Sequence, residues 1–235
     1  MITVVIPTLN SDLTLATTLT SLVPGVVAGV VRDVVIVDAG STDHTLAVAD
    51  SAGAEIISVA QRGRGPQLRT GAAAARGDWL LFLHSDTALE PGWEAEVAGF
   101  IDGIRAGRRD DSAAAFRFAL DDSGLAPRVV EAGVSARCSL FGLPYGDQGL
   151  LVSRALYDAV GGYPDLPLME DVEIVRRLGR KRVTMLRSRA LTSAARYRRA
   201  GYASRVVRNW TCLVLHRIGV PIGTIQRIYG GRDPR

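Results

Sequence analysis

Cysteine is scarce in this chain of 235 residues, which contains only Cys138 and Cys212. The two lie far apart and form none of the close spacings that bind zinc or exchange disulfides, so the sequence excludes these classes of site. Unpaired cysteines fit a reducing compartment. We therefore expect a cytoplasmic protein in which both thiols are core or surface residues.

Long apolar runs are also missing. The apolar stretches are short or are interrupted by charge, as at Arg32-Asp33, whereas a membrane-spanning helix needs about 20 apolar residues in succession. A strand pattern begins directly after Met1, so we expect no secretory signal peptide. With 47% hydrophobic and 22% charged residues, the chain has the composition of one globular domain.

Lysine is nearly absent, since 27 of the 28 basic residues are arginine and Lys181 is the exception. The net charge is +4, and a basic cluster lies between residues 176 and 208. No helix-turn-helix, RNA-recognition or zinc pattern accompanies this cluster, so we expect no nucleic-acid partner. The cluster is either a solvated face or a site for phosphate groups of a diphosphate donor or a lipid-phosphate acceptor.

The most informative feature present is an apolar run that ends in a short acidic turn. Residues 79–83 are apolar, and His84, Ser85 and Asp86 follow them. Such a run is typical of a strand buried on both faces, and open α/β sheets bind ligands where their strands end. Asp86 is an oxygen ligand of the kind that Mg²⁺ or Mn²⁺ takes together with a diphosphate. The alternative is a strand followed by an ordinary aspartate cap.

Strand and helix patterns alternate before this run. Strand patterns cover residues 2–6, 34–37 and 56–59, and helical patterns cover 12–24 and 45–52. The order predicts a parallel sheet with helices on both faces. Asp43 is expected to cap the second helix rather than to bind a ligand. After the run, we expect a charged, glycine-rich connection at 99–115, and strands at 113–120, 150–152 and 183–186.

Four motifs resemble, in order and spacing, those of the family 2 glycosyltransferases of the GT-A fold. They are VVIPTLN (4–10), VIVDAGSTDHT (35–45), RGRGPQLRTGAAAARGDWLLFLHSDT (62–87) and LPLMEDVEIVRRL (166–178). The resemblance covers roughly residues 1–200 and is strongest to a small bacterial branch with HSDT in place of the usual acidic triplet. It implies metal-dependent, inverting transfer of a sugar from a nucleotide-sugar, with a UDP-sugar as the expected donor, to an acceptor hydroxyl that the sequence does not identify.

The resemblance also implies the fold class and the domain boundaries. We expect an α/β GT-A domain at residues 1–200, with a Rossmann-like, mostly parallel central sheet flanked by helices. Residues 1–98 would form its nucleotide-binding half and residues 99–200 its acceptor-binding half. A C-terminal helical tail would occupy residues 201–235.

Donor contacts are expected where the first two strands end. By resemblance, Thr8, Asn10 and Asp38 would hold the base and ribose, and a carboxylate can accept a hydrogen bond from either group. The alternative for Asp38 is an Asx-turn into Gly40. Arg69 stands where the family has an arginine beside the nucleotide.

Several basic residues are candidates for the donor phosphates. Residues 61–71 read as a glycine-rich basic loop that enters a helix, and glycines let a backbone approach phosphates. From this loop, Arg62 or Arg64 would close over the phosphates, and Arg64 is the residue chosen as the candidate. Arg196 and Arg199 belong to a late basic motif that the family also places near the phosphates.

The acidic turn supplies the metal ligand by resemblance. Asp86 matches the metal-binding position and would hold Mn²⁺ or Mg²⁺ beside the donor diphosphate. His84 replaces the usual first aspartate, and it would contact the donor ribose, ligate the metal as a neutral imidazole, or serve as a structural residue at the strand end.

A polar turn at residues 145–148 would line the acceptor side of the donor sugar. Asp147 and Gln148 can hydrogen-bond sugar hydroxyls, Gly146 gives the turn its backbone, and Tyr145 offers a stacking face. The alternative is a plain polar turn.

The candidate base lies at the start of a helix expected from Glu170 to Leu178. By resemblance the second acid of the pair, Asp171, takes the proton of the acceptor hydroxyl, while Glu170 would orient the acceptor or hold an arginine. Helix capping is the alternative, because an acidic first turn suits the helix dipole.

The tail has apolar residues at near-helical spacing from Tyr202 to Ile218, with arginines between them. It would pack on the catalytic domain, form a homodimer contact, or lie on an anionic membrane at the inner face. A membrane contact would suit a lipid-linked acceptor, but packing or dimerisation is the commoner outcome.

Two other functions remain open at this level. A nucleotidyltransferase of related fold would carry a glycine-rich basic loop after the first strand, where this chain has Pro7-Thr8-Leu9-Asn10. A non-catalytic nucleotide-sugar-binding or partner protein is also possible, because His84 departs from the family pattern.

Overall fold

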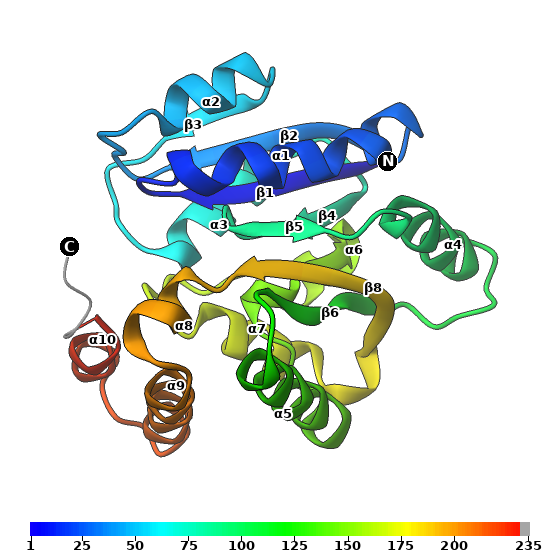
Figure 1. Cartoon of the computed structure of the whole chain (residues 1–235). Helices are drawn as coiled ribbons and strands as arrows, with labels where there is room; N and C mark the ends of the chain where they lie inside the picture. Colours follow the sequence, from blue (N-terminus) through cyan, green and yellow to red (C-terminus); the bar gives the residue numbers. More distant parts are fainter. Residues whose placement is uncertain (231–235) are drawn as a thin grey trace.

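The computed structural model describes residues 1–230, and in this part of the chain helices surround one sheet of eight strands (Figure 1). The strands lie side by side in the order β3-β2-β1-β4-β7-β6-β8-β5. In chain order they are β1 (Ile2–Thr8), β2 (Val31–Asp38), β3 (Glu55–Ser58), β4 (Trp79–Phe82), β5 (Thr87–Leu89), β6 (Ala113–Asp121), β7 (Leu150–Ser153) and β8 (Val183–Ser193).

The helices connect the strands, and three of those in residues 1–230 follow the last strand. They are α1 (Asp12–Val27), α2 (Thr45–Ser51), α3 (Arg64–Ala74), α4 (Trp93–Arg105), α5 (Leu125–Phe141), α6 (Arg154–Ala159), α7 (Glu170–Leu178), α8 (Ala195–Ala200), α9 (Tyr202–Arg217) and α10 (Ile222–Gly230). Short 3-10 turns lie at Gly146–Gln148 and Arg180–Arg182.

The N-terminal half is the parallel sheet that the alternating patterns predict. β1 pairs in parallel with β2 and β4, and β2 pairs in parallel with β3. Side chains along β1 alternate between two cores: Val4 and Ile6 pack with α1 on one face, while Val5 packs with Leu68 of α3 on the other. A strand buried on both faces explains why its sequence is continuously apolar.

The C-terminal half of the sheet is mixed. β7 pairs antiparallel with β4 and β6, β6 pairs in parallel with β8, and β5 pairs antiparallel with β8. The α/β class with a helix-flanked central sheet is confirmed, and four of the seven pairings in the described chain are parallel.

Three predicted boundaries were wrong. The connection predicted at 99–115 begins with helix, because α4 buries Trp93, Val97 and Phe100 at helical spacing despite two glycines. In the segment predicted as a loop at 61–71, α3 already begins at Arg64. The last strand continues to Ser193 because β6 and β5 pair with its second half.

The described part of the tail packs on the rest of the chain. Cys212 of α9 and Ile225 of α10 are fully buried and form one cluster with Leu168 and Met169, which precede α7. Packing, one of the three predicted roles of the tail, is therefore observed. Residues 231–235, the last of the predicted tail, lie outside the described residues. Within residues 1–230 no helix combines the length and apolar character needed to cross a bilayer.

Candidate functional site

The ends of β1 and β2 are joined through Asp38. Its carboxylate accepts hydrogen bonds from the Thr8 hydroxyl at 3.0 Å, from the backbone N–H groups of Gly40 and Ser41, and from the Ser41 hydroxyl. Burial alone would raise the pKa of Asp38, but these hydrogen bonds hold it below its ordinary value. The strand ends are neighbours as predicted, and the Asp38 carboxylate forms the Asx-turn that was its alternative role.

Gln67 ties α3 to the same edge of the sheet. This buried side chain donates to the carbonyl oxygens of Thr8 at 2.9 Å and Val37 at 2.7 Å. One turn later, a Cβ on Gly71 would lie only 2.3 Å from the Val5 side chain, so only glycine allows this close approach. α3 is thereby held with its N-terminus at the carboxyl ends of β1 and β2.

The acidic turn after β4 is held from both sides. The Thr18 hydroxyl of α1 donates to the Ser85 carbonyl at 3.0 Å, and the Ser193 N–H of β8 donates to the Asp86 carbonyl at 2.9 Å. The Asp86 carboxylate lies 3.7 Å from the Arg196 guanidinium. Burial and, second, the charge of Arg64 lower the pKa of His84 to about 4, so this imidazole is neutral at pH 7.

The candidate base meets the polar turn at Gly146. The Asp171 carboxylate accepts hydrogen bonds from the Gly146 N–H at 2.9 Å and the Val172 N–H at 2.8 Å. A Cβ on Gly146 would lie 2.6 Å from Nε2 of His84, so glycine permits the turn, the end of β4 and the start of α7 to converge. Asp171 thus belongs to one cluster with the acidic turn.

Arg64 and Glu170 form an ion pair beside this cluster. The Arg64 Nε lies 2.9 Å from Glu170 Oε1, and the Glu170 side chain is completely buried. Burial raises the pKa of Glu170 to about 7, against the opposing charge of Arg64. Glu170 therefore holds an arginine, which was one of its two predicted roles.

Two adjoining cavities open at this edge of the sheet. The outer one has a volume of about 490 Å³, within the range of ligand pockets. It is lined by strand-end and α3 residues, including Thr8, Ser11 and Gln67. The inner cavity is lined by the candidate base and the polar turn, including Tyr145, Asp147 and Asp171. Residues that line both are Arg64, His84, Asp86, Leu168, Arg196, Arg205 and Tyr229.

Within the polar turn, Asp147 and Gln148 differ in what they can do. Burial raises the pKa of Asp147 to about 6, although the charge of Arg137 opposes it, and its Oδ1 has no hydrogen-bond partner among the described residues. Gln148 is buried, and its amide accepts from Arg137 and donates to the Phe116 carbonyl. Asp147 is free to bond a ligand, whereas Gln148 supports the turn.

Seven of the predicted site residues do not line either cavity: Asn10, Asp38, Arg69, Gly146, Gln148, Glu170 and Arg199. Asn10 is exposed and accepts a hydrogen bond from the Thr42 N–H. Arg69 and Arg199 are exposed on the helices that also carry Arg64 and Arg196. The side chain of Tyr145 does line the inner cavity, with the Arg137 guanidinium 3.4 Å from its ring centroid.

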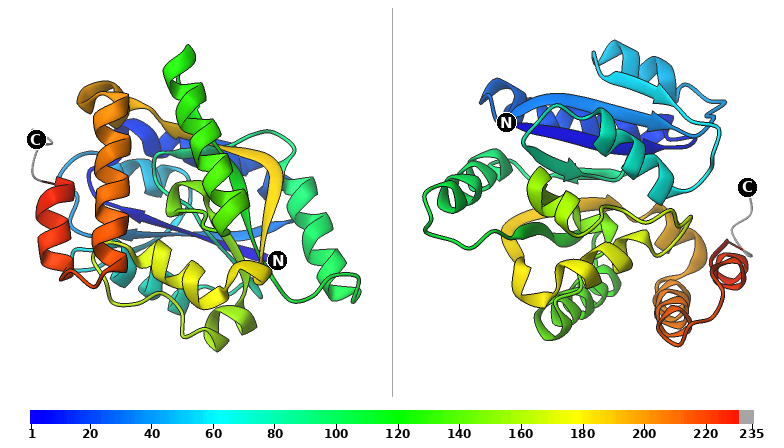
Figure 2. Two further views of the ribbon diagram at one scale, coloured as in Figure 1. Left: turned by 90° about the horizontal axis from the view of Figure 1, so that it is seen from below. Right: turned by 180° about the vertical axis from the view of Figure 1, so that it is seen from behind.

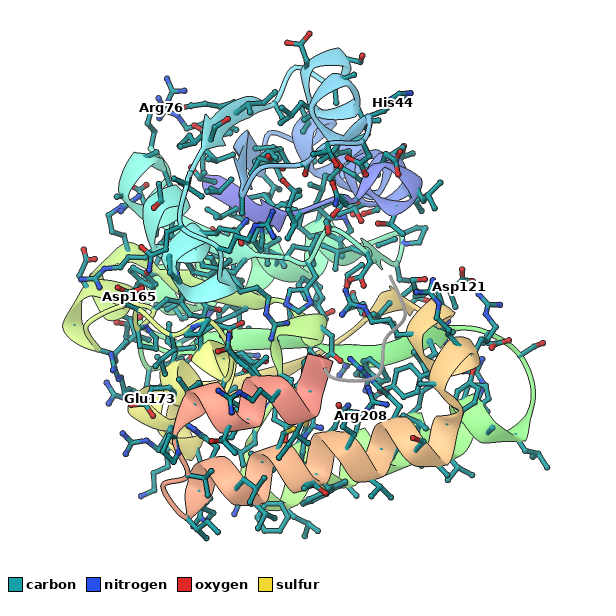
Figure 3. All side chains as sticks on the ribbon, turned by 90° about the vertical axis from the view of Figure 1, so that its left-hand side faces the viewer. His44, Arg76, Asp121, Asp165, Glu173 and Arg208 are labelled. Atoms are coloured by element: carbon teal, nitrogen blue, oxygen red, sulfur yellow. The ribbon has the colours of Figure 1, made fainter. Side chains whose placement is uncertain are left out.

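Three residues at this site were not among the predicted site residues. Gln67 lies inside a motif whose arginines and glycines were more conspicuous, and Arg205 and Tyr229 lie in the tail beyond every motif. The Arg205 guanidinium donates to the Tyr229 hydroxyl at 2.8 Å and lies 4.7 Å from its ring. Figure 3 views the side on which α9 and α10 lie in front of the sheet, with Arg208 labelled on α9.

The residues present fit a divalent cation. Mg²⁺ and Mn²⁺ are commonly held by one or two carboxylates and the substrate's phosphates. Asp86 offers such a carboxylate, and the neutral imidazole of His84 lines the same cavity. Residues 1–230 contain no cluster of three His, Cys, Asp or Glu side chains that could hold an ion by themselves. A cation here would therefore need ligand oxygens from the substrate.

A parallel half-sheet joined to a mixed half, with a polar cleft where β1 and β4 end, is the GT-A architecture. Residues 3–125 match the family model described as Glycosyl transferase family 2, and the chain belongs to this family. Glucosyl-3-phosphoglycerate synthases from Mycolicibacterium paratuberculosis and Mycobacterium tuberculosis H37Rv are 37% and 36% identical to it over 93 residues. The match covers 36% of this chain and 28% of each relative, so it spans less than a third of the curated relatives' length.

Solved structures share the fold at low sequence identity. M. tuberculosis glucosyl-3-phosphoglycerate synthase in complex with Mn²⁺, UDP and glucosyl-3-phosphoglycerate has a TM-score of 0.58 and 22% identity, covering 94% of this chain and 81% of its own. S. aureus TarS in complex with UDP-GlcNAc has a TM-score of 0.62 and 16% identity, covering 98% and 70%. At 22% and 16% sequence identity, these structural similarities establish the fold alone.

Proposed function

We propose that this protein is an inverting glycosyltransferase that moves a sugar from a nucleotide-sugar, with a UDP-sugar as first choice, to an acceptor hydroxyl. Asp86 and Asp171 line the same inner cavity as Arg64 and Arg196, and this observation carries the proposal. One carboxylate suits a cation beside a diphosphate, and the other suits proton transfer. Mn²⁺ or Mg²⁺ is the proposed cofactor, in line with the Mn²⁺ in the M. tuberculosis complex.

The donor would lie across the two cavities. The nucleoside fits the outer cavity beside Thr8 and Gln67, with Asp38 shaping the wall behind them through its Asx-turn. The diphosphate would lie between Arg64 and Arg196, whose guanidinium groups can each form paired hydrogen bonds with phosphate oxygens. When bound, the cation at Asp86 neutralises charge on the departing diphosphate.

Asp171 would act as the base. Its carboxylate accepts two backbone hydrogen bonds, and a carboxylate has about four acceptor sites, so it can also accept the proton of a hydroxyl. The acceptor oxygen would attack the sugar's C1 as the bond from C1 to the diphosphate breaks. Tyr145 and Asp147 would contact the sugar or the acceptor in the inner cavity, and Gly146 would form the turn between them.

We propose further that the acceptor carries an anionic group. Arg205 brings a third guanidinium to the wall shared by both cavities. Phosphoglyceric acid, present with UDP-glucose in an M. tuberculosis synthase complex of similar fold, is an acceptor of this chemistry, and a lipid-linked phosphate is another.

A donor screen tests the function. We expect UDP-sugars with Mn²⁺ to raise the melting temperature more than GDP- or dTDP-sugars or Mn²⁺ alone. Stabilisation by NAD(P) alone, or by no nucleotide, would contradict the proposal. Proton NMR of the product should then show the opposite anomer from the donor. Release of pyrophosphate, in place of a nucleoside diphosphate, would indicate a nucleotidyltransferase instead.

A further inference from the structure

The helices α5 and α9 expose an unusual amount of apolar surface. Of the fifteen large apolar residues exposed in the described chain, seven lie on these two helices and an eighth directly follows α9. They are Leu125, Val129, Leu140 and Phe141 on α5, Val207, Trp210 and Val214 on α9, and Ile218 after it. We call this set the α5–α9 face. Scattered exposed apolar residues are ordinary, but a contiguous group marks an interaction surface.

The two helices lie side by side and present these residues away from the core. α5 and α9 contact each other, and Val130 of α5 and Val206 of α9 pack into one cluster. On and directly after α9, residues 207, 210, 214 and 218 recur at helical spacing on the side opposite the fully buried Cys212. Figure 1 places both helices at the bottom of the molecule, and the left view of Figure 2 shows them next to each other.

The chain around this face carries an excess of positive charge. Residues 174–230, which include all of α9, contain fourteen basic residues and no acidic one. Near α5, Glu131 pairs with Arg128, Asp122 accepts from Tyr202 and lies 3.9 Å from Arg198, and Asp121 is exposed. Arg176, Arg177, Arg189 and Arg196 pair with acidic side chains, but the segment keeps an excess of positive charge. An apolar stripe beside an excess of positive charge is the pattern of surfaces that bind anionic membranes.

We propose that the α5–α9 face docks on an anionic membrane surface. A second copy of the chain is the rival occupant of an exposed apolar face. A two-fold contact would set the same surface against itself, and so bring the basic segment of one copy towards that of the other. A bilayer containing anionic lipid offers negative charge and an apolar interior together.

The side of α9 opposite the exposed apolar residues faces the inner cavity. Arg205, Asn209 and Leu213 of α9 line the inner cavity. A helix with its side chains is about 10–12 Å across, so docking would hold that cavity roughly one helix diameter from the membrane. Docking would bring the cavity within reach of a lipid-linked acceptor. That consequence rests on the proposed function, whereas the docking itself does not.

Vesicle sedimentation of the full chain, without donor or metal, tests the docking. We expect binding to phosphatidylcholine vesicles with 30% phosphatidylglycerol, little binding to pure phosphatidylcholine, and release at high salt, about 0.5 M or more. The double variant Trp210→Ser with Val214→Ser should lower the partition coefficient by about tenfold, because both side chains would insert below the headgroups. Neither residue belongs to a buried cluster, and circular dichroism would verify that the variant folds.

Matched substitutions lie on the opposite side of the molecule. Leu13 and Val27 of α1 are 92% and 83% exposed, so Leu13→Ser with Val27→Ser removes a similar amount of exposed apolar surface. This control should bind vesicles as the wild type does. Absence of wild-type binding, or equal loss in both variants, would overturn the proposal. So would a dimer in lipid-free sedimentation that only the Trp210 and Val214 substitutions dissociate.

Because the assay omits donor and acceptor, it separates the two proposals. A chain that binds vesicles but transfers no sugar would overturn the proposed function and leave the docking in place. A chain that transfers sugar but does not bind vesicles would overturn the docking and leave the proposed function in place.

Discussion

The charged side chains at the cleft are held in place by hydrogen bonds and ion pairs to neighbouring groups. Asp171 is oriented by two backbone N–H groups, Asp86 faces Arg196, and Arg64 is paired with a buried glutamate. Such fixed positions let a carboxylate be replaced by its amide with little change of shape. The two amide variants therefore separate metal binding from proton transfer.

Asp86→Asn should weaken Mn²⁺-dependent UDP binding by about 10- to 100-fold or more, since even outer groups of a metal site are worth that much. The melting temperature without ligand should change little, because the side chain lies at the cleft and packs in no core cluster. Isothermal titration of UDP with and without Mn²⁺ measures the effect. An unchanged metal-dependent affinity would refute the assignment.

Asp171→Asn should bind donor and metal normally but transfer sugar about 10²–10⁴-fold more slowly, the usual contribution of a positioned proton acceptor. Asparagine caps a helix nearly as well as aspartate, so a purely structural Asp171 would leave both activity and stability intact. Initial rates with saturating donor distinguish these outcomes. Asp86→Asn serves as the opposite control, since it should lose metal-dependent donor binding.

Helix α7 is the element that presents the candidate base. Three acids occupy its first turn and two arginines its last, which complements the helix dipole. Inside the helix, the Glu173 carboxylate accepts from Arg176 at 2.8–2.9 Å and from Arg177 at 3.0 Å. Hydrogen bonds from Arg176, with further help from Arg177, lower the pKa of Glu173 from 4.5 to about 2.

This lowered pKa predicts an acid dependence. A carboxyl group with a depressed pKa stabilises the fold above its ordinary pKa, and this stabilisation disappears as the pH falls towards the folded value. Glu173→Gln should therefore cost about 1 kcal/mol at pH 7, allowing for the exposure of Arg176. The difference from wild type in urea unfolding should shrink between pH 4.5 and about 2. A difference that does not vary with pH would show that packing, not charge, is lost.

At the scale of the whole molecule, the last two helices complete the site. Ile225 of α10 and Cys212 of α9 pack behind Leu168 and Met169, and these two residues lead directly into Glu170 and Asp171. Met169 itself has a left-handed backbone, with φ of 64°. A non-glycine residue adopts this conformation only where surrounding packing stabilises it.

Ile225→Ala should lower the free energy of unfolding by about 2–4 kcal/mol, as expected for a fully buried aliphatic side chain. Transfer should also slow at temperatures where the variant remains folded, because the segment before Asp171 loses its support. Ile228→Ala on the same helix is the control, since that side chain is 40% exposed and should cost less than about 1 kcal/mol. Equal effects of the two substitutions would argue against the role of α10.

Periodicity and motif order alone determined the parallel half of the sheet, the strand ends at Thr8, Asp38 and Asp86, and the start of α7. These features depend on local burial and on turn residues near each other in the chain, which a sequence displays directly. Tertiary structure decided which of the many arginines reaches the cleft. Arg64 does so because Glu170, over a hundred residues away, holds it, while Arg69 faces outward from the same helix. Tertiary packing also places the Gln148 amide against the Phe116 carbonyl, where it supports the turn, and places Tyr229 in the cavity wall. Contacts between distant segments depend on how whole elements pack, and no local pattern records that.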